Sequence, residues 1–394
     1  VFDLSNNNDT DGIFTSNYVT RTGISSSKNL YFSNSPLLTQ ERLQSLTNDA
    51  NAELLSLDVL NKGIDTSRLE QNATGLVSLK KQVSQVASNP DAIITFWNVR
   101  DGEVLADLNV KEIRFAGQFN SFTSFAPKPG TTVGPLTVLR GSSLSAGTMT
   151  IGAGALTFAE NSRLVGGTIQ TANGTDLTLE FDRDFVQNST DPAFAAGQKL
   201  KINSKGNSVR LMNRTNSFAE ISVNTGGGNF MIASDSGLTI TDLSTSGGSV
   251  VLDSRGSITA TIVSAGSVIF RAGGPVKLDG FFAAASGSGS SVSLNNAAAG
   301  FVLGGIRSDS SVSVTGTGQA ILVGDIIGSS SVSFDNMVTV ARDSTVASSG
   351  GRIEFARTVA ALNAVAGLRL DAGFGGVIAL GGNIGSPSLS FGWV

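Results

Sequence analysis

A short phrase recurs at a fixed spacing of 20 residues in the last third of the chain. Ser291-Val292-Ser293-Leu294 returns as Ser311-Val312-Ser313-Val314 and again as Ser331-Val332-Ser333-Phe334. A second phrase keeps the same step, because residues 301–306 (Phe-Val-Leu-Gly-Gly-Ile) are followed by residues 321–326 (Ile-Leu-Val-Gly-Asp-Ile). A fixed period of this length, with short alternating strands inside it, is typical of a chain that winds into stacked turns. The repeat therefore predicts a solenoid.

Short strands with the same alternating pattern continue over the last two thirds of the chain. Strands of three to five residues are separated by Gly, Ser, Asn and Thr, and apolar and polar residues alternate along them, as in Ile221-Ser222-Val223 and Leu238-Thr239-Ile240. Alternation places one side of each strand against an apolar interior. A sandwich or a barrel also uses such strands, but the fixed recurrence favours winding. We expect a mainly β protein with a parallel β-helix (β-solenoid) of about 20 residues per turn over residues 131–394.

The segment before the solenoid predicts two further parts. Residues 1–34 are polar and are broken by Asn, Ser and Gly, so we expect an extended N-terminal arm. Residues 35–90 predict a helical hairpin that caps the first turn. Ser35-Pro36 is a favoured helix start, apolar residues then recur at spacings of three and four, and Asn89-Pro90 ends the second helix.

Residues 91–130 are expected to hold the first strands and a linker. The alternating stretch Ile93-Ile94-Thr95-Phe96-Trp97 indicates a strand, and the turn-rich Pro127-Lys128-Pro129-Gly130 marks a boundary. No segment comparable to the hairpin follows the last strands in the given sequence, which indicates either truncation or an open C-terminal end that accepts a strand of another subunit.

Composition excludes several classes of function. The chain of 394 residues has no His and no Cys, which removes Ser-His-Asp and Cys-His catalysis and thiolate metal sites. Residues 128–394 carry 17 basic and 17 acidic side chains, so nucleic acid is not an expected partner. No run of 18 apolar residues is present, and no membrane-spanning helix is predicted. We expect no catalytic residues and no cofactor other than calcium.

Three carboxylates give the alternative of an enzyme. Glu180, Asp182 and Asp184 alternate with Phe181 and Arg183, so on one strand they would share a face about 6.5–7 Å apart. That separation suits a glycosidase or a lyase that acts on a polysaccharide. An outward polar face close to a turn is the competing and favoured interpretation.

Two further groups of polar residues suggest binding. Asn7, Asp9 and Asp11, with Gly12 in the sixth position, match the first half of a calcium loop, although Tyr18 replaces the closing Glu. Five cations could bind an anionic glycan, or they could form a solvated turn face that balances the nearby acids. They are Lys199, Lys201, Lys205, Arg210 and Arg214.

The repeat phrases also carry a resemblance. Residues 301–306, Val323-Gly324-Asp325-Ile326 and residues 378–386 (Ile-Ala-Leu-Gly-Gly-Asn-Ile-Gly-Ser) resemble the repeats of filamentous-haemagglutinin-like adhesins and related large secreted β-helical bacterial surface proteins. The resemblance covers roughly residues 235–394. It implies a right-handed parallel β-helix, export from the cell, and a role in adhesion or the extracellular matrix. The chain departs from that family because an Asn-Pro-Asn secretion motif is missing.

We therefore expect an extracellular structural or adhesive protein of a bacterial surface rather than an enzyme. Its expected partners are other copies of itself, end to end, and a surface glycan. The extended arm and the open end motivate a filament or matrix subunit. The alternatives are an enzyme that acts on polysaccharide and an adhesin that binds glycan without cleaving it.

Overall fold

The computed structural model describes the chain from its first strands to residue 385, with gaps. The described residues are 29–32, 52–55, 88–97, 102–104, 109–116, 120–125, 136–138, 143–151, 155–159, 163–165, 168–171, 174–191, 193–261, 263–284, 290–296, 299–363 and 365–385. Within them the chain consists of β-strands, turns and bends and contains no helix.

The chain forms two compact units. Unit 1 comprises Val1–Arg183 and Thr190–Leu200, and unit 2 comprises Asp184–Ser189 and Lys201–Val394. Both are coils of parallel strands, so the expected mainly β parallel solenoid is confirmed.

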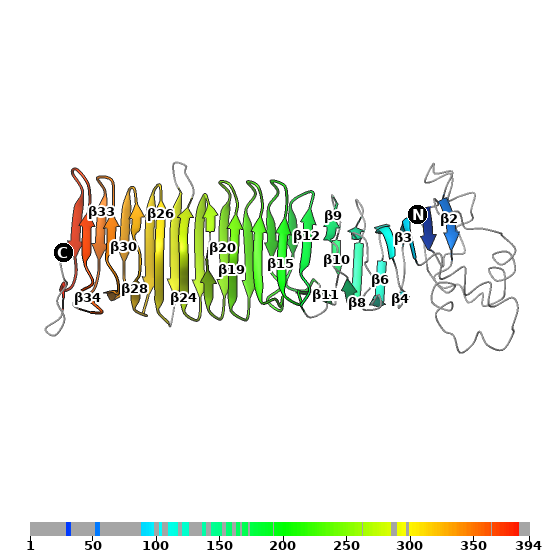
Figure 1. Cartoon of the computed structure of the whole chain (residues 1–394), viewed down its shortest axis with the longest axis horizontal. Helices are drawn as coiled ribbons and strands as arrows, with labels where there is room; N and C mark the ends of the chain where they lie inside the picture. Colours follow the sequence, from blue (N-terminus) through cyan, green and yellow to red (C-terminus); the bar gives the residue numbers. More distant parts are fainter. Residues whose placement is uncertain are drawn as a thin grey trace, which may run out of the picture. The chain divides into compact units, whose positions relative to one another are not determined.

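The spine of unit 2 is a ten-stranded sheet in which every neighbouring pair is parallel, and its strands stack side by side (Figure 1). Each strand pairs with one about a coil further along the chain, so every coil hydrogen-bonds the coil before and the coil after it. In chain order the strands are β13 (Phe185–Gln187), β16 (Val209–Leu211), β18 (Phe230–Ser234), β20 (Ser249–Ser254), β23 (Ser267–Ala272), β25 (Ser291–Asn296), β27 (Ser311–Gly316), β30 (Ser331–Phe334), β33 (Arg352–Phe355) and β36 (Val377–Leu380).

The remaining strands of unit 2 close the coil. In several coils two short strands lie between consecutive members of the ten-stranded sheet, whereas β24 and β26 run through both positions. The strands of unit 2 that lie outside the ten-stranded sheet are β17 (Glu220–Asn224), β19 (Leu238–Ser244), β21 (Ile258–Ala260), β22 (Val263–Ala265), β24 (Val276–Ala284), β26 (Phe301–Ser308), β28 (Ala320–Leu322), β29 (Ile326–Gly328), β31 (Val338–Val340), β32 (Ser344–Ala347), β34 (Val359–Ala361) and β35 (Leu368–Asp371). Strand β15 (Lys199–Asn203) carries residues of both units.

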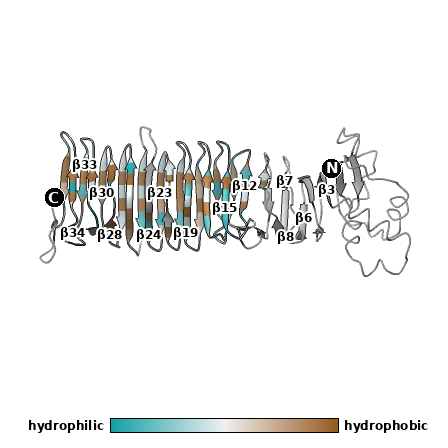
Figure 2. Cartoon of the chain, viewed as in Figure 1, coloured by the Kyte–Doolittle hydropathy of each residue, from teal (hydrophilic) through white to brown (hydrophobic). Residues whose placement is uncertain are grey.

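The core of unit 2 follows from alternation. Inward positions are fully buried and outward positions are partly exposed. Hydrophobic and hydrophilic residues accordingly alternate along the strands of unit 2 (Figure 2). Inward residues stack in columns from coil to coil, as where the rings of Phe334 and Phe355 lie parallel with centroids 5.2 Å apart. Burying one such ring contributes roughly 1.5–3 kcal/mol. Because each coil covers the next, the stack provides a core that no single coil could.

The first repeat phrase sets the register as the sequence predicts, but the second does not. Ser291 pairs with Ser311 and then Ser331, an offset of 20 at each step. Phe301 pairs instead with Ala320, an offset of 19, and the offset returns to 20 only at Ile306. The expected match of residues 301–303 with residues 321–323 is therefore wrong by one residue. A slip of one residue reverses the face of a strand, so Ala320 and Leu322 point inward while Ile321 points outward.

Gly316 shows how closely adjacent coils approach. It ends β27 with φ +145°, a left-handed conformation, and an added Cβ would lie 1.9 Å from the carbonyl oxygen of Asn296 in the preceding coil. Only glycine meets both conditions. The side chain of Asn296 is buried at the same level and donates from Nδ2 to the carbonyl oxygen of Gly274 at 2.8 Å. A buried side-chain amide thus supplies the hydrogen bond that a backbone N–H would otherwise give to this carbonyl oxygen, at a point where the coil turns.

Unit 1 repeats the scheme with stacked phenylalanines. Phe158 lies 5.3 Å from Phe181, and Phe96 lies 5.9 Å from Phe115, both in stacked geometry. One set of parallel strands is β1 (Asn29–Phe32), β2 (Ala52–Leu55), β3 (Ser88–Trp97), β5 (Asn109–Ala116), β7 (Leu136–Val138), β9 (Ala155–Phe158) and β12 (Leu177–Phe181). The second set is β4 (Gly102–Val104), β6 (Asn120–Phe125), β8 (Ser143–Ile151), β10 (Arg163–Val165), β11 (Thr168–Thr171) and β14 (Ala193–Ala195).

The predicted helical hairpin of residues 35–90 is wrong where the structure describes that segment. Ala52–Leu55 form β2 inside the predicted first helix. Strand β3 (Ser88–Trp97) takes in residues 88–90 of the hairpin and confirms the strand predicted at residues 93–97. Both strands pair in parallel with β1, which itself falls within the predicted arm. The pattern of four residues such as Ala-Glu-Leu-Leu is compatible with a helix or with a strand. Here they form a strand because they pair with the edge of β1. The rest of the hairpin lies outside the described residues.

The predicted boundary at residues 127–130 also lies outside the described residues. Parallel pairing is present on both sides of it, because Ile113 of β5 pairs with Leu136 of β7. Strands therefore coil from β3 onward, earlier than residue 131.

Candidate functional site

The three predicted carboxylates do not share one strand. Glu180 lies near the end of β12, which stops at Phe181, whereas Asp182 and Asp184 lie in the bend that follows it. The expectation of three acids on a single strand face is wrong, because the chain leaves the extended conformation after Phe181. Asp182 and Asp184 are exposed.

Asp184 instead ties two coils of unit 2 together. Its Oδ1 accepts a hydrogen bond of 2.7 Å from the backbone N–H of Ser208, 24 residues ahead, at the start of the next strand of the sheet. The contact recurs along unit 2: each time a backbone N–H one coil later donates to a side-chain oxygen. It thus gives a carboxylate a structural role. The other pairs are Ser208 with Asn229, Asn229 with Ser249, Asp325 with Thr345, and Asp343 with Gly367.

The five predicted cations lie on several elements, which include strands β15 and β16 and a turn. Arg210 is exposed on β16, and Lys205 lies in a turn with φ 50°. Arg214 contacts Asp253 at 2.8 Å and Asp235 at 3.9 Å, so part of the positive charge balances acids of neighbouring coils. Lys199 and Lys201 alternate along β15 as predicted.

The predicted calcium ligands Asn7, Asp9 and Asp11 lie outside the described residues. Across the ranges that the structure does describe, no three His, Cys, Asp or Glu residues gather as ligands of a metal ion. Nor do those ranges contain a helix long and apolar enough to cross a membrane.

A lattice of hydroxyl groups covers part of the ten-stranded sheet. Strands β25, β27 and β30 each present two serines on their outer side, in register, about 4.8 Å apart between coils and about 7 Å apart along a strand. Oγ of Ser333 donates to Oγ of Ser313 over 3.3 Å. These partly exposed side chains are uncharged and can both donate and accept. The serine face consists of Ser291, Ser293, Ser311, Ser313, Ser331 and Ser333.

A cluster of exposed apolar side chains lies in the last described coils of unit 2. Six of the eight large apolar residues that are exposed in the described part of the chain fall between residues 362 and 380, and the other two are Val186 and Met337. Isolated exposed residues are normal, and here six of them fall within 19 residues of the chain. We call this cluster the end coil: Leu362, Val365, Phe374, Val377, Ile378 and Leu380.

The end coil is exposed because the sheet stops there in the described residues. Ile378 pairs with Ile353, and Leu380 pairs with Phe355. The two residues of β33 are completely buried, whereas Ile378 is 42% exposed and Leu380 is 46% exposed. The inward columns of the core therefore become exposed at β36, as apolar side chains beside an edge that no other described strand pairs with.

One charged pair separates the serine face from the end coil. On β33 the guanidinium of Arg352 binds both carboxylate oxygens of Glu354 at 2.9 and 3.1 Å. This hydrogen-bonded pairing lowers the pKa of Glu354 and raises the pKa of Arg352. Both groups are solvent-exposed, so their mutual attraction contributes little to stability.

Comparisons with known proteins leave the family open. No protein-family model matches the chain, and neither curated proteins nor solved structures include a significant match. The function must therefore be argued from the surfaces of the chain itself.

The sequence pattern predicted that the serine segments repeat, but not that their side chains form an exposed face. The residues of the end coil were not predicted to be exposed. A usable signal was present, because no charged residue occurs between Asp371 and residue 385. A strand that borders solvent usually carries charge or proline.

Proposed function

We propose that the chain is an extracellular structural or adhesive β-solenoid protein of a bacterial surface. In this proposal it associates with other copies of itself through its ends, the N-terminal arm and the C-terminal end coil, as a filament or matrix subunit. The observation that carries the proposal is the end coil, where apolar side chains cluster beside a strand edge that no other described strand pairs with. Open parallel edges pair readily with further strands.

The resemblance to filamentous-haemagglutinin-like adhesins supports the bacterial and extracellular part of the proposal. The phrases that carry it, residues 301–306 and Val323–Ile326, fall on or beside strands β26, β28 and β29 of successive coils. Repeats in such positions form a scaffold with a long uniform surface, which suits adhesion and matrix assembly.

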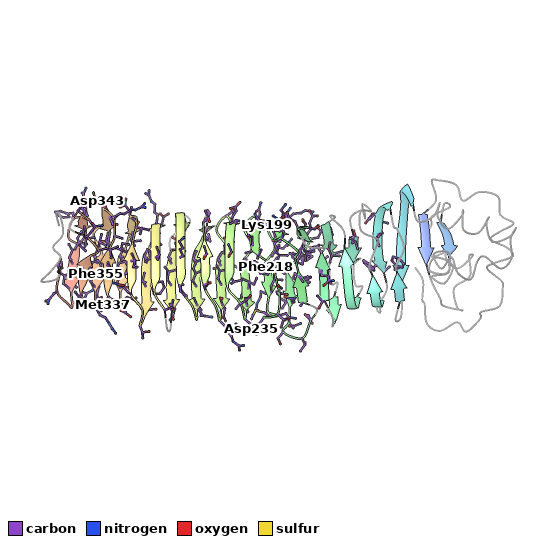
Figure 3. All side chains as sticks on the ribbon, turned by 60° about the horizontal axis from the view of Figure 1, so that its bottom comes forward. Lys199, Phe218, Asp235, Met337, Asp343 and Phe355 are labelled. Carbon is purple, nitrogen blue, oxygen red and sulfur yellow. The ribbon has the colours of Figure 1, made fainter. Side chains whose placement is uncertain are left out.

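Electron microscopy combined with light scattering tests self-association. The expected result is assembly that increases with protein concentration and joins particles end to end. Monodisperse single particles at the highest attainable concentration would contradict the proposal. Leu380→Lys is expected to reduce assembly, and Met337→Lys is the matched control because Met337 is 49% exposed and lies at the margin of the stack (Figure 3).

The serine face favours a second function, the binding of a neutral glycan without cleavage. Regularly spaced hydroxyl groups can exchange hydrogen bonds with sugar hydroxyls, and the absence of charge on these six side chains removes any preference for acidic polymers. Binding to immobilised neutral polysaccharides is the test. Ser313→Asp should abolish binding, while Ser264→Asp, on β22 of another face, should leave it unchanged. Equal loss in both variants, or no binding by the parent chain, would remove this candidate.

A further inference from the structure

The triplet Asn-x-Ser/Thr occurs five times in the chain, and two of these triplets lie wholly within the described residues. They are Asn188-Ser189-Thr190 and Asn213-Arg214-Thr215. Such a triplet is the acceptor for N-linked glycans, in which a sugar is attached to the side-chain amide nitrogen of the Asn. An attached glycan is bulky and hydrophilic, so a folded chain can carry one only where the Asn projects into solvent. The two triplets differ on this criterion.

Asn188 lies in an exposed turn with a fixed base. It directly follows β13, and all three residues of its triplet are exposed. The preceding residue, Gln187, is completely buried. Its amide exchanges two hydrogen bonds with the buried amide of Asn216, because Nε2 of Gln187 donates to Oδ1 at 3.0 Å and Nδ2 of Asn216 donates to Oε1 at 2.8 Å. This buried pair holds the end of β13 in place, and the chain then leaves the core at Asn188.

Asn213 belongs to the same kind of triplet but is only 7% exposed. Its Oδ1 accepts hydrogen bonds from the backbone N–H of Thr215 at 2.9 Å and from Oγ1 of Thr215 at 2.7 Å. The side chain thus closes a local turn. A glycan on Nδ2 would displace the buried amide and break both hydrogen bonds, so the described fold is incompatible with a sugar at Asn213.

We propose that Asn188 is a glycosylation site of the folded chain and that Asn213 is not. The donor is a sugar whose C1 is linked to a diphosphate carrier, and a transferase catalyses the step. Nδ2 of Asn188 forms a bond to C1, the bond between C1 and the carrier oxygen breaks, and its electron pair leaves with the diphosphate. The amide nitrogen releases one proton. The hydroxyl of Thr190 completes the triplet that the transferase recognises.

Cell-free glycosylation of the purified, folded full chain tests the inference, and mass spectrometry of its peptides locates each sugar. One reaction uses a nucleotide-linked donor and the other a lipid-linked donor, each with a transferase whose activity is verified on an unrelated acceptor protein. At least one reaction should attach a sugar to Asn188 and none to Asn213, and the successful reaction identifies the carrier. A synthetic peptide of residues 208–220 should accept a sugar at Asn213 in that reaction, because the peptide is not folded over it.

Two single substitutions provide matched variants within the turn. Thr190→Ala should abolish modification of Asn188, because it removes the hydroxyl of the triplet, whereas Ser189→Ala leaves the triplet intact and should retain it. Both replaced side chains are exposed, so neither change should disturb folding.

Three results would overturn the inference: no sugar at Asn188 with either donor, equal modification of Asn188 and Asn213 in the folded chain, or modification that survives Thr190→Ala. The inference goes beyond the proposed function and does not rest on it. Self-association is measured separately by light scattering, so either idea can fail while the other stands.

Discussion

Strands β30 and β36 belong to the same sheet and have similar patterns, but they differ in what covers them. Val332 and Phe334 of β30 are completely buried between β27 and β33. Ile378 and Leu380 of β36 occupy the same columns two coils later and remain more than two fifths exposed. In a solenoid the burial of a side chain thus depends on the following coil as much as on the residue itself. The same pattern makes core where a further coil covers it and exposed apolar surface where the described coils stop.

The largest expected effect tests this contrast in the core. Phe334→Ala should lower the free energy of unfolding by about 3–5 kcal/mol, because it removes a buried ring that stacks on Phe355. Leu380→Ala should lower it by about 1 kcal/mol or less, since roughly half of the side chain already contacts water. Chemical denaturation of both variants at low protein concentration provides the measurement. Equal losses would show that β36 is covered in solution.

Replacing a glycine should likewise cost more stability in a covered coil than in the last described coils. Gly316→Ala is expected to cost about 3 kcal/mol, because it combines a left-handed φ with a contact of 1.9 Å to the preceding coil. Gly375 in the last described coils also has a positive φ, 74°, but nothing lies near an added Cβ. Gly375→Ala should therefore cost only the conformational strain, about 1 kcal/mol. Thermal unfolding compares the two, and a milder effect at Gly316 would contradict the described packing.

The hydrogen bonds of acidic residues should differ between inner and outer coils. Asp343 accepts from the N–H of Gly367, 24 residues ahead, whereas Asp371 accepts from the N–H of Gly373 within its own turn. Removing the contact between coils with Asp343→Ala should cost about 1 kcal/mol, and Asp343→Asn should retain most of it. Asp371→Ala should cost a few tenths of a kcal/mol at most. The comparison fails if Asp371 proves the more important residue.

The smallest effect concerns the charged pair between the two regions. Because Arg352 lowers the pKa of Glu354 in the folded state, the pair adds stability above the unfolded pKa of Glu354. That contribution is lost as the pH falls through the lowered folded pKa. In Arg352→Gln the pKa of Glu354 should return toward its ordinary value, which NMR titration of the carboxyl group can follow. An unchanged pKa would mean that the two side chains do not pair in solution.

The sequence predicted the parts of the fold that repeat and missed those that depend on neighbours. The spacing of Ser291, Ser311 and Ser331 was sufficient for the parallel coil and its register. It did not reveal the offset of 19 at Phe301, because a turn between two strands can absorb one residue without changing the pattern.

Local pattern also failed where tertiary context decides. Leu54 fits a helical stripe, yet an adjacent strand draws it into β2. The acids at positions 180 to 184 alternate as on a strand, yet β12 ends at Phe181. The exposure of Ile378 and Leu380 could not be read from their own alternation, which is that of a core strand, and depends on which coil lies beside them.

Hydrogen exchange at β36, followed as a function of protein concentration, tests the central claim most directly. The amides of Ile378 and Leu380 should exchange fast in dilute samples and become protected as the concentration rises, while those of Val332 and Phe334 on β30 stay protected throughout. That result would establish β36 as the edge through which copies meet. Protection at β36 that does not change with concentration would contradict the account, because the edge would then be either covered within one chain or never covered at all.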